Sequence, residues 1–159
     1  MTPTERQEIA ARLDGYLDAL ASVDGRFREY VMGAILLDLA GRSVESVLTD
    51  HFKSSEHHSF AIASMTRGAS WTEVEEFLRR NVLIAPVFGA NDPAGSDLEK
   101  TRSELAFQAS DMVMFLSPGQ SPQGIHHLVL TEDKAMSSVA CAVEYEGDLL
   151  LIQRTHWRR

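Results

Sequence analysis

Four side chains that can carry positive charge fall on the apolar faces of segments that alternate like β-strands. Three of them lie near the C-terminus: His126, Arg154 and His156. The fourth, His58, lies on the apolar face of an earlier strand-like segment. A guanidinium on an apolar face needs a partner, and it can bind a carboxylate through paired hydrogen bonds. A histidine titrates near neutral pH and can transfer protons. We therefore expect Arg154 to anchor an anionic ligand and His126 or His156 to act as acid or base.

A predicted hairpin near the C-terminus contains Arg154 and His156 and sets the residues that face them. Residues 137–145 and 148–157 read as two strands, and Glu146-Gly147 between them suits a two-residue loop. That loop sets the register of three facing pairs: Val143 with Leu150, Cys141 with Ile152, and Val139 with Arg154.

The same alternation selects the residues that surround a ligand. Cys141 and Ile152 share the apolar face with Arg154, because residues two apart in a strand point to the same side. His58 and His126 likewise share the more apolar side of their own strands. We expect Cys141, Ile152 and His58 to help bind a small ligand in a hydrophobic pocket.

Two other interpretations of these side chains stay open. In the first, the strands end at the rim of the sheet, so that Arg154 and His156 reach solvent. In the second, His58, His126 and His156 hold a metal ion. No compact ligand motif of histidines and glutamate is present, so we expect no metal. No glycine-rich loop for phosphate or dinucleotide is present either, so we expect no cofactor.

Helix starts are predicted where a hydroxyl residue precedes a glutamate by three positions. This pattern occurs at three places: Thr2 to Glu5, Ser70 to Glu73, and Ser96 to Glu99. Ser43 is a further N-cap. We expect the first helix to end at Asp24-Gly25 and the helix after Ser96 to end near Phe107.

Strand patterns account for most of the remaining chain. We expect strands at His58 to Met65, Asp111 to Leu116 and Ile125 to Thr131. Tyr30 to Leu39 fits a buried strand or a helix, because a continuous apolar run shows no period. Pro86 to Gly95 is too rich in glycine and proline to be regular. Residues 1–159 thus predict one α+β domain, with a mostly antiparallel, curved sheet and three to four helices packed on one face.

The composition limits the partners. Fifteen Lys and Arg against 23 Asp and Glu give a net charge of −8, which argues against nucleic acid and anionic membranes. The longest apolar run, Val31 to Leu37, is far short of a membrane span, and residues 1–6 do not resemble a signal peptide. We therefore expect a cytoplasmic protein.

The first predicted helix carries a family resemblance. It contains Glu8-Ile9, Leu13, Tyr16-Leu17 and Ala19-Leu20, and is followed by Asp24. This pattern resembles the start of the nuclear-transport-factor-like cone fold of ketosteroid isomerases and polyketide cyclases. The segment from Val139 to Trp157 is similar to the late strands of that family. The resemblance implies an apolar ligand held between a curved sheet and helices, next to an acid, a base or a histidine.

A second resemblance is to chorismate lyases and the related effector-binding domains of transcription regulators. Three segments are similar in pattern: Leu36 to Val44, Met65 to Gly68, and Gly147 to Leu151. This resemblance also implies an α+β domain that encloses a small organic ligand.

We therefore expect a domain that binds an apolar or aromatic, anionic metabolite. Acid–base chemistry without a cofactor would make it an isomerase, cyclase, dehydratase or lyase. The alternative is a non-catalytic protein-interaction or inhibitor module that uses an acidic surface and a sheet edge. A ligand-sized hollow against the Arg154 face favours the first class, and a filled core with an exposed apolar patch favours the second. Either class is compatible with a homodimer.

Overall fold

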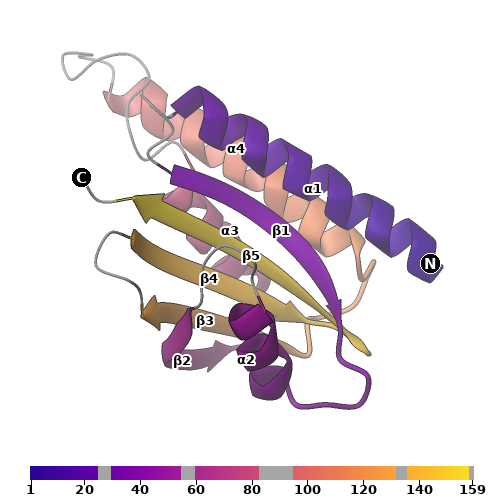
Figure 1. Cartoon of the computed structure of the whole chain (residues 1–159). Coiled ribbons are helices and arrows are strands. Elements are labelled where there is room, and N and C mark those ends of the chain that lie inside the picture. Colours follow the sequence, from indigo (N-terminus) through magenta and orange to yellow (C-terminus); the bar gives the residue numbers. More distant parts are fainter. Residues whose placement is uncertain (25–29, 55–59, 83–94, 132–135, 158–159) are drawn as a thin grey trace.

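The chain forms an α+β fold around a five-stranded antiparallel sheet (Figure 1). The computed structural model describes residues 1–24, 30–54, 60–82, 95–131 and 136–157. The helices are α1 (Pro3–Asp24), α2 (Val44–Ser54), α3 (Trp71–Asn81) and α4 (Gly95–Phe115). The strands are β1 (Tyr30–Asp38), β2 (Ala61–Gly68), β3 (Gly124–Thr131), β4 (Met136–Glu144) and β5 (Asp148–Trp157). Their order across the sheet is β1-β5-β4-β3-β2, so β1 and β2 are the edges.

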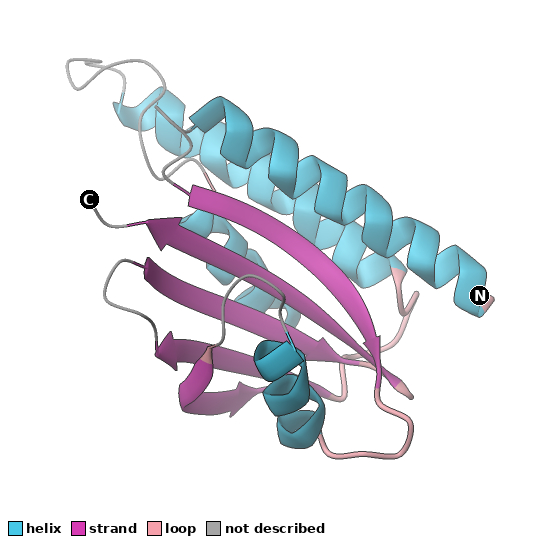
Figure 2. Cartoon of the chain, viewed as in Figure 1, coloured by secondary structure: helices cyan, strands magenta, loops and turns pink. Residues whose placement is uncertain are grey.

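Both faces of the sheet carry helices. Helices α1, α3 and α4 pack on one face, which we call the three-helix face, and α2 packs on the other, the α2 face (Figure 2). Along β5 the division follows the alternation of side chains: Leu150 and Ile152 join the core under three helices, whereas Leu149 and Leu151 join the core under α2. The predicted fold class is confirmed, with three helices on one face and the fourth on the opposite face.

The predicted hairpin is confirmed. Strands β4 and β5 pair with Val143 opposite Leu150, Cys141 opposite Ile152 and Val139 opposite Arg154. The turn is closed by a hydrogen bond from Tyr145 N–H to the Asp148 carbonyl, and Gly147 has a φ of +81°. Glycine adopts this left-handed conformation without the steric cost that other residues meet.

Two capping boxes start α1 and α3 as the sequence predicts. Glu5 accepts from Thr2 N–H at 2.6 Å, and Thr2 Oγ1 accepts from Glu5 N–H at 3.2 Å. At α3, Ser70 N–H donates to Glu73 at 3.0 Å. The Ser43 hydroxyl accepts from Ser46 N–H at the start of α2. Local signals therefore set where these helices begin.

The strand predicted at Asp111 to Leu116 is wrong, because this segment belongs to the end of α4 and the turn after it. Four residues are fully or almost fully buried at helical spacing: Ala106, Ala109, Val113 and Leu116. This stripe faces α1 and α3 and extends the helix to Phe115, beyond the predicted end near Phe107.

Other boundaries also differ from prediction. Tyr30 to Leu39, left open between helix and strand, forms the strand β1. The strand predicted from His58 begins at Ala61 and continues to Gly68, and His58 lies outside the described residues. The loop predicted at Pro86 to Gly95 also lies outside them, apart from Gly95, the first residue of α4.

The edge strand β1 is covered in part by α1. Figure 1 shows α1 and α4 side by side, with α1 running along β1. From α1, Asp14 Oδ1 accepts a hydrogen bond of 2.8 Å from Ala34 N–H, so a side chain satisfies a backbone donor of the sheet edge. Within the described ranges, no helix is both long and apolar enough to cross a lipid bilayer.

Two glycine substitutions should have opposite effects on stability. Gly147→Ala forces a methyl-bearing residue into a φ of +81° and should lower the free energy of unfolding by about 1 kcal/mol. Gly15→Ala lies inside α1, where a methyl meets nothing within 4 Å, and should raise it by about 0.5–1 kcal/mol. Urea denaturation of both variants checks the pair, and changes of the same sign would contradict this account of the turn.

Candidate functional site

Arg154 lies on the three-helix face, as the alternation along β5 predicts. It stands opposite Met32 of β1 and Val139 of β4, and it is partly buried. Arg154 lines a groove between α3 and strands β2 to β5, which we call the α3 groove, with a volume of about 860 Å³. This volume is in the range of sites for small organic ligands.

The floor of the α3 groove is one row of residues across four strands. The register places Ser64, Val129, Val139 and Arg154 directly opposite one another along this row. Val129 is 52% exposed although it lies on the three-helix face, so the helices leave this part of the sheet uncovered. The floor is therefore apolar at its centre, with a hydroxyl at the β2 edge and a guanidinium at β5.

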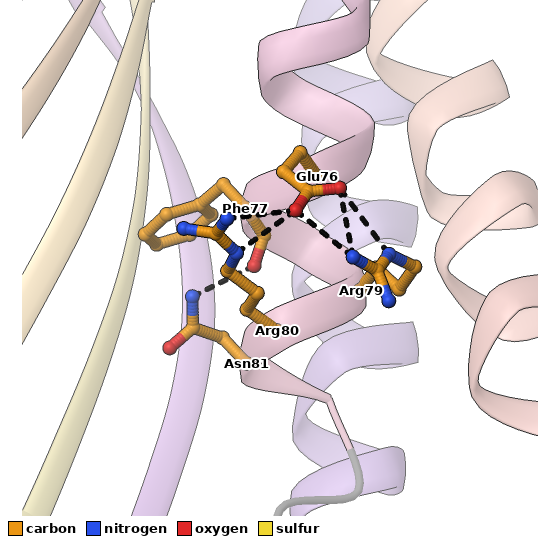
Figure 3. A network of polar contacts seen from close by, with 5 residues as sticks. All are labelled: Glu76, Phe77, Arg79, Arg80 and Asn81. Carbon is orange, nitrogen blue, oxygen red and sulfur yellow. Dashed lines mark hydrogen bonds and ion pairs between the residues drawn. The ribbon is translucent and has the colours of Figure 1, made fainter. Parts of the chain in front are cut away.

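One wall of the groove is the side of α3 from residue 72 to residue 81, whose C-terminal part is drawn in Figure 3. Phe77 and Asn81 point from this helix toward the sheet, whereas Arg79 lies on the side of α4. Arg79 Nη2 donates to both carboxylate oxygens of Glu76, at 2.9 and 3.0 Å, and Arg80 Nε donates to Oε1 at 2.9 Å. The hydrogen bond from Arg79 is the main cause that lowers the pKa of Glu76, so this carboxylate stays ionised and holds Arg80 at the groove.

At its other end the groove contains a histidine–carboxylate pair. His127 Nε2 lies 3.2 Å from Glu73 Oε1, and both side chains are about one third exposed. Glu73 is the capping glutamate of α3, and its Oε2 accepts hydrogen bonds of 3.0 Å from the N–H groups of Ala69 and Ser70. The hydrogen bond from Ser70 is the largest cause that lowers the pKa of Glu73, and those from His127 and Ala69 act in the same direction.

Gly68, the last residue of β2, makes room for this carboxylate. A methyl group built on Gly68 would overlap both carboxylate oxygens of Glu73. The carboxylate therefore lies directly against the backbone of β2, in a place that only glycine leaves open. Three elements meet at this point: the end of β2, the start of α3, and His127 of β3.

His126 lies on the opposite side of the sheet. It is 6% exposed on the α2 face, where Nε2 is 3.0 Å from Glu144 Oε2. Its register partner on β2 is Arg67, whose Nη2 donates to the Gln123 carbonyl at 2.8 Å. The structure therefore does not bring His126 and Arg154 together, because β3 turns His127 rather than His126 toward the three-helix face.

Three further residues predicted for the site do not line the groove: Cys141, Ile152 and His156. Cys141 and Ile152 are 0% exposed in the core between the sheet and the three helices. His156 is partly exposed on β5, two residues beyond Arg154 and on the same face. His58 cannot be placed, since it lies outside the described residues.

His127 and Glu73 are not among the residues predicted from the sequence. The signals were present: Glu73 ends a capping box, and His127 follows His126 with the opposite orientation. What the sequence did not provide is which face of β3 meets α3. In the described part of the chain, no three His, Cys, Asp or Glu side chains are grouped closely enough to hold a metal ion. No protein-family model matches the chain, and no curated protein matches it.

Glu73 should stabilise the fold in a pH-dependent manner. Its pKa in the folded protein lies below the ordinary value of 4.5, so its contribution is present above pH 4.5 and is lost as the pH falls through the lower folded value. The difference in unfolding free energy between wild type and Glu73→Gln should therefore shrink in acid. Urea denaturation over a pH series measures it, with Glu75→Gln as a control for removing a carboxylate of α3 outside the capping box. A difference that stays constant in acid would contradict the account.

Cys141 should be chemically inert in the folded protein. Burial raises the pKa of its thiol to about 12, which leaves about one thiolate in a hundred thousand near neutral pH. We expect iodoacetamide to modify Cys141 only after unfolding, as mass spectrometry with and without urea would show. If iodoacetamide modified Cys141 in the native protein as fast as in the unfolded chain, the thiol could not be buried as described.

Proposed function

We propose that the α3 groove binds a small organic acid with an apolar or aromatic body. The observation that carries this proposal is the groove floor, where exposed Val129 and partly exposed Val139 lead to the guanidinium of Arg154. Apolar contacts supply binding free energy, and a guanidinium selects a carboxylate by paired hydrogen bonds. Phe77 on the wall adds a ring against which a flat ligand can pack.

The strand geometry suggests the length of the ligand. Arg154 and His127 are separated by two strand spacings of about 4.8 Å and by two residues of about 3.3 Å along the strands, which places their Cα atoms about 12 Å apart. A ligand that meets both side chains needs a spacer the size of an aromatic ring between its polar ends. Acetate-sized acids are too short to contact the arginine and the histidine together.

The two family resemblances remain predictions that agree with this proposal. Both the cone fold of ketosteroid isomerases and the chorismate lyase-like domains imply a small organic ligand enclosed by an α+β domain. An isomerase, cyclase, dehydratase or lyase without a cofactor, in the cytoplasm, is the finer form of the proposal.

A non-catalytic interaction module remains the alternative. One observation favours it: β2 is an edge of the sheet, and most of its side chains are exposed or partly exposed. An extended segment of a partner could add to this edge by backbone hydrogen bonds. Such binding would depend on β2 and would not require Arg154.

Calorimetric titration with 3-phenylpropionate, benzoate and acetate tests ligand binding. We expect 3-phenylpropionate to bind most tightly and acetate not measurably, because the apolar floor contributes only to the longer acids. Arg154→Ala should weaken binding about tenfold or more, the loss typical of a charge-assisted hydrogen bond. Arg154→Lys should recover only part of it, since lysine cannot form the paired geometry.

Arg12→Ala is the matched control, because Arg12 is exposed on α1 and does not line the groove. It should leave binding unchanged while removing one positive charge, as Arg154→Ala does. Equal affinity of wild type and Arg154→Ala for 3-phenylpropionate would exclude Arg154 as the anchor.

A further inference from the structure

We propose that His127 is the proton-transfer residue of the α3 groove and that Glu73 is its positioning residue. This inference rests on the proposed function, because it gives the bound acid a reaction: removal of a proton from a carbon next to a carbonyl group. His127 belongs to the lining of the groove and is one third exposed, so a ligand in the groove can reach its ring.

The hydrogen bond to Glu73 decides which ring nitrogen is basic. An ionised carboxylate only accepts hydrogen bonds, so the 3.2 Å contact assigns the proton of neutral His127 to Nε2. Among the described residues, Glu73 is the hydrogen-bond partner of the His127 ring. Nδ1 then carries the lone pair, which is the requirement for a general base.

Glu73 makes one backbone hydrogen bond more than the capping box provides, from Ala69 N–H. Its Oε2 is fixed by two backbone N–H groups, and its carboxylate lies against Gly68, so Oε1 faces His127 in one orientation. A carboxylate that orients a neutral imidazole and stabilises its protonated form is the arrangement used by catalytic histidines in hydrolases. A surface ion pair without such support would add little order to the ring.

Acidic and basic side chains share the groove with His127. The charged side chains of the groove lining are Glu73, Glu76 and Arg80 from α3 and Arg154 from β5, and the buried thiol of Cys141 on β4 is the register partner of His127. On this face β2 contributes the hydroxyls of Ser64 and Thr66. Glu73 bonds to the cap and to His127, and Glu76 bonds to Arg79 and Arg80. Arg80 and Arg154 are the cationic side chains of the groove lining.

The reaction balances without a co-reactant. The C–H bond breaks, its proton goes to Nδ1 of His127, and its electron pair moves into the carbonyl, which becomes an enolate. The protonated ring of His127 trades its proton with solvent, so reprotonation of the same carbon gives exchange, and reprotonation of another carbon of a conjugated enolate gives isomerisation.

Exchange of 4-acetylbenzoate in D₂O tests the proposal. Its carboxylate suits Arg154, its ring suits the apolar floor, and the methyl hydrogens next to its ketone exchange through an enolate. Proton NMR follows the loss of the methyl signal. We expect wild type to accelerate the loss over buffer and His127→Gln to reduce the rate roughly a hundredfold, the usual contribution of a general base.

His126→Gln is the matched control. His126 is adjacent in sequence but lies on the other face of the sheet, so this variant should retain the wild-type rate once its folding is verified by circular dichroism. The comparison also decides between the acid–base residue predicted from the sequence and the one indicated by the groove. Loss of exchange in His126→Gln with retention in His127→Gln would overturn the proposal.

Positioning by Glu73 has its own readout. Glu73→Gln and Gly68→Ala should each slow exchange by about tenfold or more while 4-acetylbenzoate still binds, since both disturb the orientation of His127 rather than the arginine anchor. Nitrogen-15 NMR should show the proton on Nε2 in wild type and a mixture of both tautomers in Glu73→Gln. Unchanged tautomer and unchanged rate would reduce Glu73 to a helix cap.

The two proposals fail in different ways. Tight binding of 4-acetylbenzoate that depends on Arg154, without any exchange above buffer, overturns the role of His127 and leaves ligand binding intact. Exchange that depends on His127 but not on Arg154 overturns the anchor and supports the proton transfer. Absence of both binding and exchange overturns both.

Discussion

The carboxylate of Glu73 is the interaction on which the rest of the site depends. It completes the cap of α3, lies against the backbone at the end of β2, and meets His127 of β3. His127 follows Glu73 by 54 residues in the chain, yet this hydrogen bond links α3 to the sheet. The wall and the floor of the α3 groove are therefore joined through the carboxylate of Glu73. Glycine at position 68 is the condition for this joint, because any larger residue would displace the carboxylate.

Strand alternation places two adjacent histidines in two different environments. His126 is buried under α2 beside Glu144, whereas His127 is partly exposed in the groove beside Glu73. Each has a carboxylate partner at similar distance, so neighbouring charge alone does not distinguish them. What distinguishes them is access, because only the ring on the three-helix face borders a ligand-sized space. A shift of one residue in the pairing of β3 would exchange their roles.

Local signals in the sequence predicted the parts of the structure that depend on neighbours in the chain. The Glu146-Gly147 loop determines the register that sets Val139 opposite Arg154, and the capping pattern at Ser70 determines the start of α3. The wrong strand at Asp111 to Leu116 arose because Met112 to Leu116 is a short continuous apolar run, which does not by itself distinguish a strand from the end of a helix. The face on which His126 lies was not predictable, since it depends on the order of strands and on which helix covers which side, and both are set by long-range packing.

The two edges of the sheet differ in how they can meet another chain. At β1 the carboxylate of Asp14, from α1, already accepts a hydrogen bond from Ala34 N–H. A strand that paired with this edge would have to displace Asp14, whose carboxylate would then lose this hydrogen bond. At β2 the neighbouring surface belongs to the groove, through Ser64 and Thr66. The β2 edge therefore differs from the β1 edge: a second copy that joined edge to edge through β2 would place two α3 grooves next to each other on one face of a continuous sheet.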